Sequence, residues 1–94
     1  MLSSFPIDLS KVKKENIDKE ILRLGIVAEL DAVNLYEQLA ASTDNNDIKK
    51  IILDIAREEK THIGEFQTLL LRLDKQQVKE LEEGKKEVEK ELKK

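Results

Sequence analysis

The sequence predicts an all-α protein, namely an antiparallel two-helix hairpin followed by a short C-terminal helix. Apolar residues recur at helical spacing through two long segments, a short polar turn separates the two, and a charged segment with one narrow apolar stripe follows. The 94 residues make one domain at most. Because apolar residues make up 39% of the chain and aromatic ones 3%, the core of a lone chain would be thin.

Residues 1–15 are expected to be irregular, because Pro6 opposes an early helix and the segment is rich in serine and lysine. The first helix is predicted over residues 16–42. Its apolar side chains form two neighbouring stripes: Ile17, Ile21, Leu24, Ala28, Leu35 and Leu39 in one, and Leu22, Ile26, Val33, Tyr36 and Ala40 in the other. Two stripes make the apolar face broader than one neighbouring helix can cover.

A polar turn, STDNND, follows the first helix, and its Asp and Asn side chains can cap the next one. The second helix is predicted over residues 47–74, with two apolar flanks: Ile48, Ile52, Ile55, Phe66, Leu69 and Leu73, and Ile51, Ala56, Ile63 and Leu70. Each helix would be roughly 40 Å long, and the short connection makes the pair antiparallel. Because a hairpin hides one face of each helix, the remaining apolar surface predicts a partner, most simply a second copy that completes a four-helix bundle.

The charged segment KQQVKELEEGKKEVEKELKK ends the chain. Its apolar stripe consists of Val78, Leu81, Val88 and Leu92. Lys85 interrupts this stripe, and Gly84 weakens a helix by roughly 1 kcal/mol relative to Ala. For residues 76–93 we predict either a short helix that needs a neighbour or a charged linker, and a frayed, solvated tail is the plain alternative.

Composition excludes several classes of protein. Without cysteine there is no disulfide, thiolate site or iron–sulfur cluster. The N-terminus lacks the pattern of a signal peptide, and no apolar run approaches the roughly 20 residues that span a bilayer. The 17 basic against 20 acidic residues disfavour nucleic acid as a partner. We therefore expect a soluble cytoplasmic protein with no membrane or nucleic-acid partner.

Three polar residues interrupt the apolar stripes at their midpoints: Glu29 in the first helix, and Glu59 and His62 in the second. Glu29 lies fifteen positions before Asp44, in the turn, and Glu59 lies fifteen after it, so the two should be level across the hairpin. The three-residue spacing from Glu59 places His62, the single histidine, on the same helix face.

A metal ion would resolve the charge conflict that this arrangement creates. Buried carboxylates without compensation are costly, and two at one level repel each other. Carboxylates with an imidazole suit iron or manganese, and zinc by affinity. One chain offers too few ligands for two metals, whereas two chains related by a two-fold axis offer four carboxylates and two imidazoles, the full set of a di-iron centre.

Each candidate also has a plainer interpretation. Glu59 could be an ordinary surface glutamate, and His62 a packed, hydrogen-bonded core histidine. Tyr36, seven residues after Glu29, is either a partner beside the metals or a plain core tyrosine. The nearby acids either attract cations or are solvated surface charges, which is the simpler interpretation: Asp31, Asp54, Glu58 and Glu65.

On these residues the chain resembles the encapsulated ferritins, ferritin-like proteins enclosed in encapsulin nanocompartments. The resemblance covers about residues 16–92 and rests on AELDAVNLYEQLA, the thirty-residue interval from Glu29 to Glu59, and EEKTH with His62. It implies a ferritin-like four-helix bundle between two protomers, a ring-shaped homo-oligomer that is typically a decamer, and a di-iron (Fe) centre at the dimer interface. Glu29, Glu59 and His62 would be the iron ligands, with Glu59 bridging, and Tyr36 matches a tyrosine beside the centre.

The resemblance further implies a ferroxidase that oxidises Fe(II) and supplies Fe(III) for storage inside an encapsulin shell. The chain departs from the family in two places. Ala28 and Asp31 stand where the family often carries acids for metal uptake, so that uptake site would be weaker or absent. No C-terminal targeting peptide is recognisable. Some members of the family are fused directly to the shell protein, and the charged tail ending at Lys94 would suit a segment cut from such a fusion.

Two other functions remain open. A rubrerythrin-like protein would use a similar centre to reduce peroxide, although this chain lacks the cysteines of a rubredoxin-type donor domain. A non-enzymatic helical oligomerisation module would use the same buried polar residues to fix the register of its helices. The three functions differ in their dependence on iron and in the oxidant.

Overall fold

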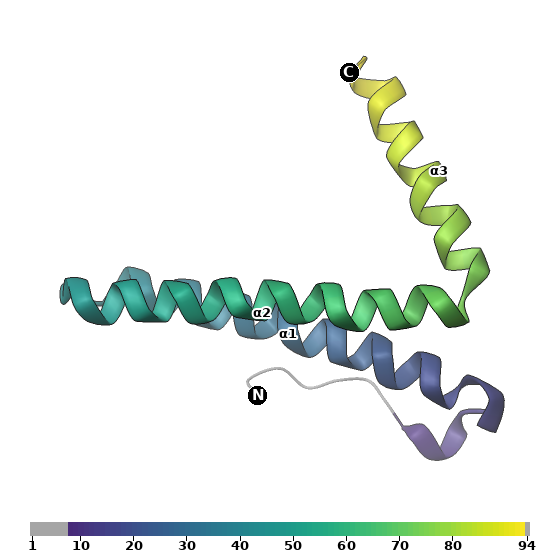
Figure 1. The fold of residues 1–94 in the computed structure, drawn as a ribbon, viewed down its shortest axis with the longest axis horizontal. Coiled ribbons are helices and arrows are strands. Elements are labelled where there is room, and N and C mark those ends of the chain that lie inside the picture. Colours follow the sequence, from purple (N-terminus) through teal and green to yellow (C-terminus); the bar gives the residue numbers. More distant parts are fainter. Residues whose placement is uncertain (1–7, 94) are drawn as a thin grey trace.

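The computed structural model describes residues 8–93, and every regular element among them is helical. Three α-helices follow one another: α1 (Ile17–Ser42), α2 (Asn46–Leu73) and α3 (Lys75–Leu92). α1 and α2 lie antiparallel as a hairpin, and α3 leaves the end of α2 steeply, away from the hairpin (Figure 1). The predicted all-α class, a two-helix hairpin with a C-terminal helix, is confirmed.

The N-terminal segment contains more regular structure than the irregular chain we predicted. Residues 1–7, with Pro6, lie outside the described residues. Two short 3₁₀ helices follow, η1 (Leu9–Lys11) and η2 (Lys14–Asn16). The carboxylate of Asp8 accepts a hydrogen bond from the Ser10 backbone N–H at 3.0 Å, so a local side-chain cap stabilises the first of them.

The turn between α1 and α2 forms because polar side chains satisfy backbone N–H groups that the helix leaves free. The Asn45 side chain accepts hydrogen bonds from the N–H groups of Asp47 and Ile48, at 3.0 and 3.1 Å. The backbone N–H of Asn45 donates in turn to Thr43 Oγ1 at 3.1 Å. This N-cap starts α2 at Asn46, one residue earlier than predicted.

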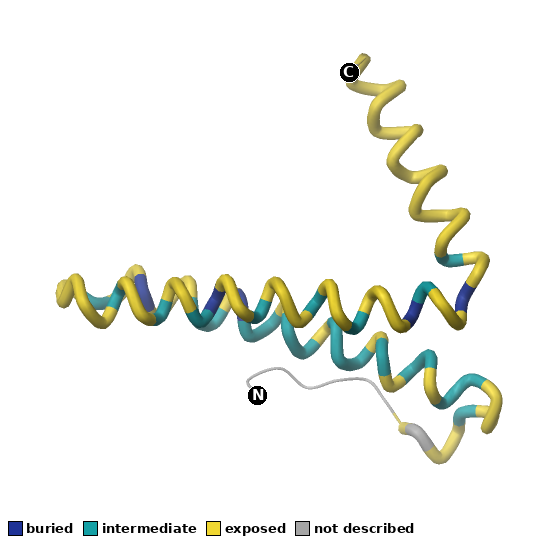
Figure 2. Tube along the Cα trace, in the orientation of Figure 1, coloured by how far each residue is buried: buried dark blue, intermediate teal, exposed yellow. Residues whose placement is uncertain are grey.

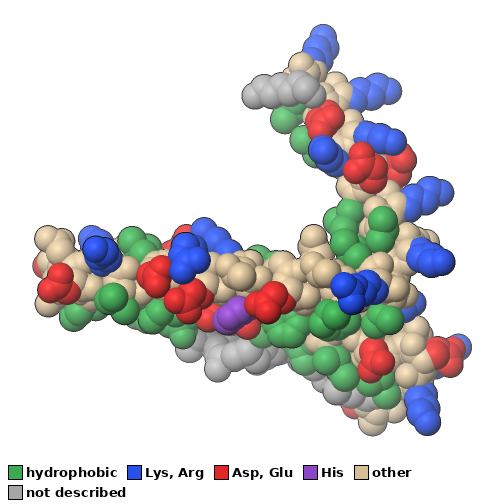
Figure 3. Space-filling view, viewed as in Figure 1, with side chains coloured by type: hydrophobic (Ala, Val, Ile, Leu, Met, Phe, Trp, Pro, Cys, Tyr) green, Lys and Arg blue, Asp and Glu red, His purple; other side chains and the backbone are tan. Residues whose placement is uncertain are grey.

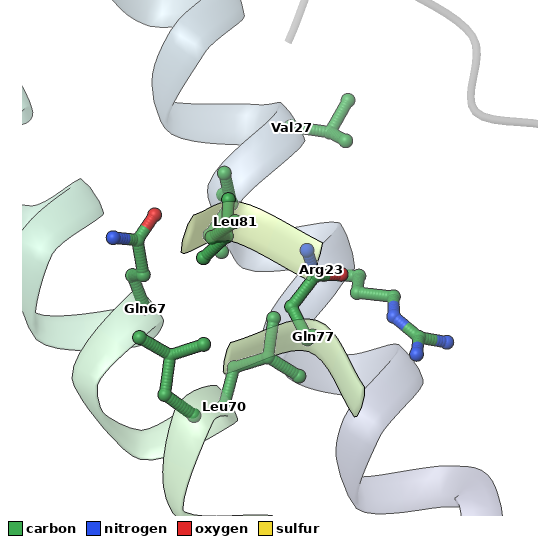
Figure 4. Close-up of a pocket in the computed structure, with 8 residues that line it drawn as sticks. Arg23, Val27, Gln67, Leu70, Gln77 and Leu81 are labelled. Carbon is green, nitrogen blue, oxygen red and sulfur yellow. The ribbon is translucent and has the colours of Figure 1, made fainter. Parts of the chain in front are cut away.

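Asp74 forms the joint between α2 and α3. Its extended backbone (φ −129°, ψ 90°) ends α2 at Leu73, one residue before the predicted limit, and its side chain caps α3 by accepting the Gln77 N–H at 2.9 Å. The other carboxylate oxygen pairs with Arg23 of α1 at 2.9 Å. A mostly apolar hollow of about 270 Å³ lies beside this joint, lined by side chains of all three helices (Figure 4).

α3 is helical from residue 75 to 92, yet almost nothing covers it. Every residue of this helix except Gln77 is exposed (Figure 2). Its apolar stripe stands between 44% and 59% exposed: Val78, Leu81, Val88 and Leu92. Of the two predicted forms, the described chain adopts the short helix, and the described hairpin covers little of it.

The core of the hairpin is thin, as its composition predicts. Among the described residues, four apolar side chains are buried: Val33, Ala40, Ala56 and Leu70. The radius of gyration is 16.7 Å, whereas a compact chain of this length would have about 12 Å. Large apolar side chains therefore stay exposed along α1 and α2, as predicted. No helix within residues 8–93 combines the length and the hydropathy that crossing a membrane requires.

Candidate metal centre

Three of the predicted site residues meet near the middle of the hairpin. Glu29 projects from α1, and Glu59 and His62 project from α2. His62 Nδ1 lies 3.6 Å from Glu29 Oε2 and 3.5 Å from Glu59 Oε2. One ligand atom from each residue lies within 4.8 Å of the other two, so a single ion could contact all three. The structure thus brings these residues together as their level match across the turn predicts.

Packed layers on both sides of the site hold the two helices at this distance. Toward the turn, Val33 and Ala56 are buried, with 8% and 2% of their surface exposed. Toward the other end, the Phe66 ring lies against Gly25. Val33 follows Glu29 by four residues, a spacing that places both on one face of α1. Packing contacts on both sides of the ligands therefore fix the distance between the two helices that carry them.

The site is open to the surface on one side. The side chains of Glu29 and Glu59 are 20% and 18% exposed, whereas that of His62 is 46% exposed. Figure 3 shows the single histidine, in purple, on the surface of the hairpin beside acidic side chains and apolar patches. An ion can therefore reach the three residues from this side, and so can the ligands of a second chain.

One carboxylate oxygen of Glu29 lacks a hydrogen-bond partner among the described residues, and this bears on whether the three residues fit a metal ion. Its Oε2 atom is buried and makes no hydrogen bond within residues 8–93, and the His62 nitrogen at 3.6 Å is too distant for one. Burying a polar atom without a partner is costly, and a bound cation would remove that cost. Two carboxylates and an imidazole are ligands that iron, manganese and zinc accept. The residues present fit a metal ion and leave part of its coordination open.

The other candidates lie farther from the three ligands. Tyr36 is half-buried on α1, roughly 10 Å along the helix axis from Glu29, and its place beside a metal stays a prediction. Arg57 contacts two of the nearby acids, Asp54 at 3.0 Å and Glu58 at 4.0 Å, with all three side chains largely exposed. These two acids therefore behave as ordinary surface charges in the described chain.

Reasoning from the sequence missed two contacts around the site. Lys60 pairs with Glu37 across the hairpin at 3.5 Å, and Gly25 packs against Phe66. The signal for the second was present: a glycine four residues before one predicted ligand, and an aromatic residue four residues after another. The ion pair has no such signal, because long charged side chains at a surface can choose among several partners.

The fold and the site together define a class of protein. A carboxylate on one helix and a Glu-x-x-His pair on an antiparallel neighbour are half of the pattern by which ferritin-like bundles hold two metal ions. The family model described as Rubrerythrin matches residues 20–94. The chain therefore belongs to the rubrerythrin family.

Within this class, the relatives of the chain are encapsulated ferritins and encapsulin cargo proteins. The crystal structure of an encapsulated ferritin domain from Pyrococcus furiosus matches with a TM-score of 0.82 and 51% identity, over 96% of this chain and 94% of that one. A ferritin-like-encapsulin shell fusion protein of Pyrococcus furiosus is 54% identical over 91 residues, which cover 94% of this chain. The encapsulin nanocompartment cargo protein EncC of Myxococcus xanthus is 40% identical over 78 residues, or 80% of this chain. The predicted resemblance to encapsulated ferritins is confirmed.

The chain is shorter than the proteins it matches in sequence. The aligned segment spans 26% of the length of the fusion protein and 60% of the length of EncC. The encapsulated ferritin domain, by contrast, is matched almost end to end. The similarity is therefore to the ferritin-like part of the fusion protein.

Proposed function

We propose that this chain is a ferroxidase that oxidises Fe(II) to Fe(III) at a di-iron centre formed between two protomers. The observation that carries the proposal is the group Glu29, Glu59 and His62, in which a buried carboxylate oxygen lacks a hydrogen-bond partner among the described residues. The rubrerythrin family and the encapsulated ferritins among the relatives support the same class of chemistry.

Pairing of two chains would complete the ligand set. One chain supplies two carboxylates and one imidazole, and a two-fold axis beside the open side of the site would supply the same set again. Each iron would then be held by Glu29 and His62 and shared across the Glu59 carboxylates. The exposed apolar side chains of the hairpin support this pairing, since Leu30 and Ile51 are 52% and 61% exposed and need cover.

The proposed reaction transfers electrons from two Fe(II) ions, as substrate, to dioxygen. Each iron gives up one electron as it becomes Fe(III), and the two electrons with two protons convert dioxygen to hydrogen peroxide. Glu29, Glu59 and His62 of the two chains would hold both ions in one site, so that the two electrons would be available together. Tyr36 would lie beside the centre as a hydrogen-bonding partner.

The proposal extends to the setting of the protein. We expect the dimer to assemble further into a ring-shaped decamer and to deliver Fe(III) for storage inside an encapsulin nanocompartment in the cytoplasm. The names of the relatives, one an encapsulin shell fusion protein and one a nanocompartment cargo protein, support an encapsulin shell as the partner. The shell protein would be fused C-terminally to this chain or bound as a separate chain.

Removal of a ligand tests the proposal directly. Glu59→Ala and His62→Ala should each slow Fe(II) oxidation at least about 100-fold, the upper end of what loss of a merely supporting residue costs. The measurement is the absorbance of Fe(III) after protein loaded anaerobically with Fe(II) is mixed with dioxygenated buffer. Glu58→Ala is the matched control, because Glu58 is exposed and its contact to Arg57 is long, at 4.0 Å. Oxidation at the native rate in both ligand variants would overturn the assignment.

Peroxide reduction is a second candidate, because the matching family model is described as Rubrerythrin. The two functions differ in the oxidant, so Fe(II)-loaded protein should be mixed with dioxygen and with hydrogen peroxide in separate experiments. Faster oxidation by dioxygen supports the ferroxidase, and rapid oxidation by peroxide alone supports the second candidate. A purely structural helical module would take up no iron at these residues in either experiment.

A further inference from the structure

Gly25 on α1 and Phe66 on α2 meet one helical turn from the proposed metal ligands. Gly25 precedes Glu29 by four residues and Phe66 follows His62 by four, so the contact lies on the same helix faces as the ligands. A Cβ atom added at Gly25 would lie 2.9 Å from two atoms of the Phe66 ring. Packed carbon atoms keep about 3.5–4.0 Å apart, so the ring occupies the space that any other residue would need.

Backbone conformation does not explain this glycine. No glycine among the described residues has a positive φ angle, so an alanine at position 25 could adopt the same backbone. Glycine inside a helix also costs roughly 1 kcal/mol relative to alanine. The remaining reason for glycine at this position is the close approach of the Phe66 ring to the α1 backbone.

The spacing of the two helices matters for metal binding because the ligands come from both of them. Glu29 reaches the site from α1, whereas Glu59 and His62 reach it from α2. Bonds from a metal to carboxylate oxygen and imidazole nitrogen are about 2.0–2.2 Å long and vary by only about 0.2 Å. Parting the helices by even about 0.5 Å at the adjacent turn would exceed that tolerance unless the side chains rearranged.

We infer that Gly25 and Phe66 are a positioning pair, whose contact sets the separation of α1 and α2 at which one metal ion can bind Glu29, Glu59 and His62. This inference rests on the proposed metal centre and assigns its geometry to residues that do not touch the metal. A side chain at position 25 would push the helices apart or turn the ring aside, and either movement would shift Glu29 relative to the ligands on α2.

The chain supplies its own matched controls. A Cβ atom added at Gly64, two residues after His62, or at Gly84 in α3 would meet nothing within 4 Å. Gly25→Ala, Gly64→Ala and Gly84→Ala therefore make the same chemical change in three helical positions. All three gain helix propensity, and only the first creates a steric conflict beside the site.

The test is an anaerobic titration of each variant with Co(II), followed by its visible absorption spectrum and by equilibrium dialysis. We expect Gly25→Ala to weaken Co(II) binding at least about tenfold and to change the spectrum, as is typical for loss of a residue that orients ligands. Gly64→Ala and Gly84→Ala should stay within about twofold of the native affinity. Gly25→Ala/Phe66→Leu should recover most of the loss, because leucine lacks the ring atoms that the new Cβ would meet.

The outcomes separate the two proposals. If the native protein binds Co(II) and folded Gly25→Ala binds it equally well, the positioning role is wrong while the metal centre stands. If the native protein binds no Co(II) or Fe(II), the metal centre itself fails and the positioning role falls with it. If Gly25→Ala alone does not fold, the double variant decides: recovered binding supports the positioning pair, and weak binding or misfolding overturns it.

Discussion

At the scale of single residues, Asp74 shows how one carboxylate can serve two elements. One oxygen accepts the Gln77 N–H and starts α3, and the other pairs with Arg23 of α1. The Gln77 N–H and, to a smaller extent, the Arg23 guanidinium hold the pKa of Asp74 below its ordinary value, although desolvation opposes them. The direction of α3 thus depends on a group that titrates in acid.

The lowered pKa of Asp74 predicts a pH dependence of stability with a defined sign. Because the folded pKa lies below the unfolded one, the contribution of this carboxylate is fully present above about pH 4 and is lost as the pH falls through the lowered value. Asp74→Asn keeps a capping side chain but cannot titrate. The loss of melting temperature between pH 7 and pH 3 should therefore be smaller in Asp74→Asn than in the native protein, as measured by circular dichroism.

The two proteins share every other carboxylate, so the difference between the two losses isolates Asp74. An equal loss in the native protein and in Asp74→Asn would show that the joint contributes nothing to the acid sensitivity. Asp74→Ala, which removes the cap as well, should be less stable than Asp74→Asn even at pH 7.

At the scale of the helices, the start of α2 depends on one side chain. Asn45 accepts hydrogen bonds from two backbone N–H groups that have no partner within the helix. Asn45→Ala should lower the free energy of unfolding by about 1 kcal/mol, which is typical of a lost N-cap. Urea unfolding followed by circular dichroism measures the change.

Asn46→Ala provides the comparison for this prediction, because Asn46 is the first residue of α2 and alanine is the better helix former there. Its stability should equal or exceed that of the native protein. If both variants lost the same stability, the cap would not be the cause. Unfolding of all the variants should be measured in the same buffer and at the same protein concentration, because association with a second chain would raise the apparent stability.

At the scale of the whole molecule, the chain exposes more apolar surface than is usual for a small protein without a partner. Its extents are 46 × 44 × 20 Å, and α3 extends away from the hairpin with its apolar stripe uncovered (Figures 1 and 2). Exposed apolar patches of this kind mark surfaces that another chain covers. The proposed metal centre needs the same partner, so binding of metal and assembly should depend on each other.

Native mass spectrometry during an anaerobic Fe(II) titration tests this dependence. We expect two iron ions for each pair of chains, together with a shift toward larger, even-numbered assemblies. A chelator should reverse the shift, and His62→Ala should prevent it. Iron bound singly to isolated chains, or the same assembly with and without iron, would contradict a centre shared between protomers.

Features of this protein that depend on the local chain could be predicted from the sequence, whereas features that depend on particular side-chain contacts could not. Helical spacing of apolar residues predicted α1 and α2 to within one residue at each end, because periodicity is a property of the local chain. Equal distances from the turn predicted that Glu29 and Glu59 would be level. The two 3₁₀ helices of the N-terminal segment were missed. The Asp8 side chain caps the first of them, whereas the second has no side-chain cap.

The sequence by itself therefore determined where the two long helices run, which of their faces are apolar, and which three side chains share one level of the hairpin. Only the tertiary structure decided the distances between them, the unpartnered oxygen of Glu29, the approach of Phe66 to Gly25 and the direction of α3. The physical reason is that periodicity assigns a residue to a face, whereas a distance depends on how side chains from segments far apart in the chain pack against each other.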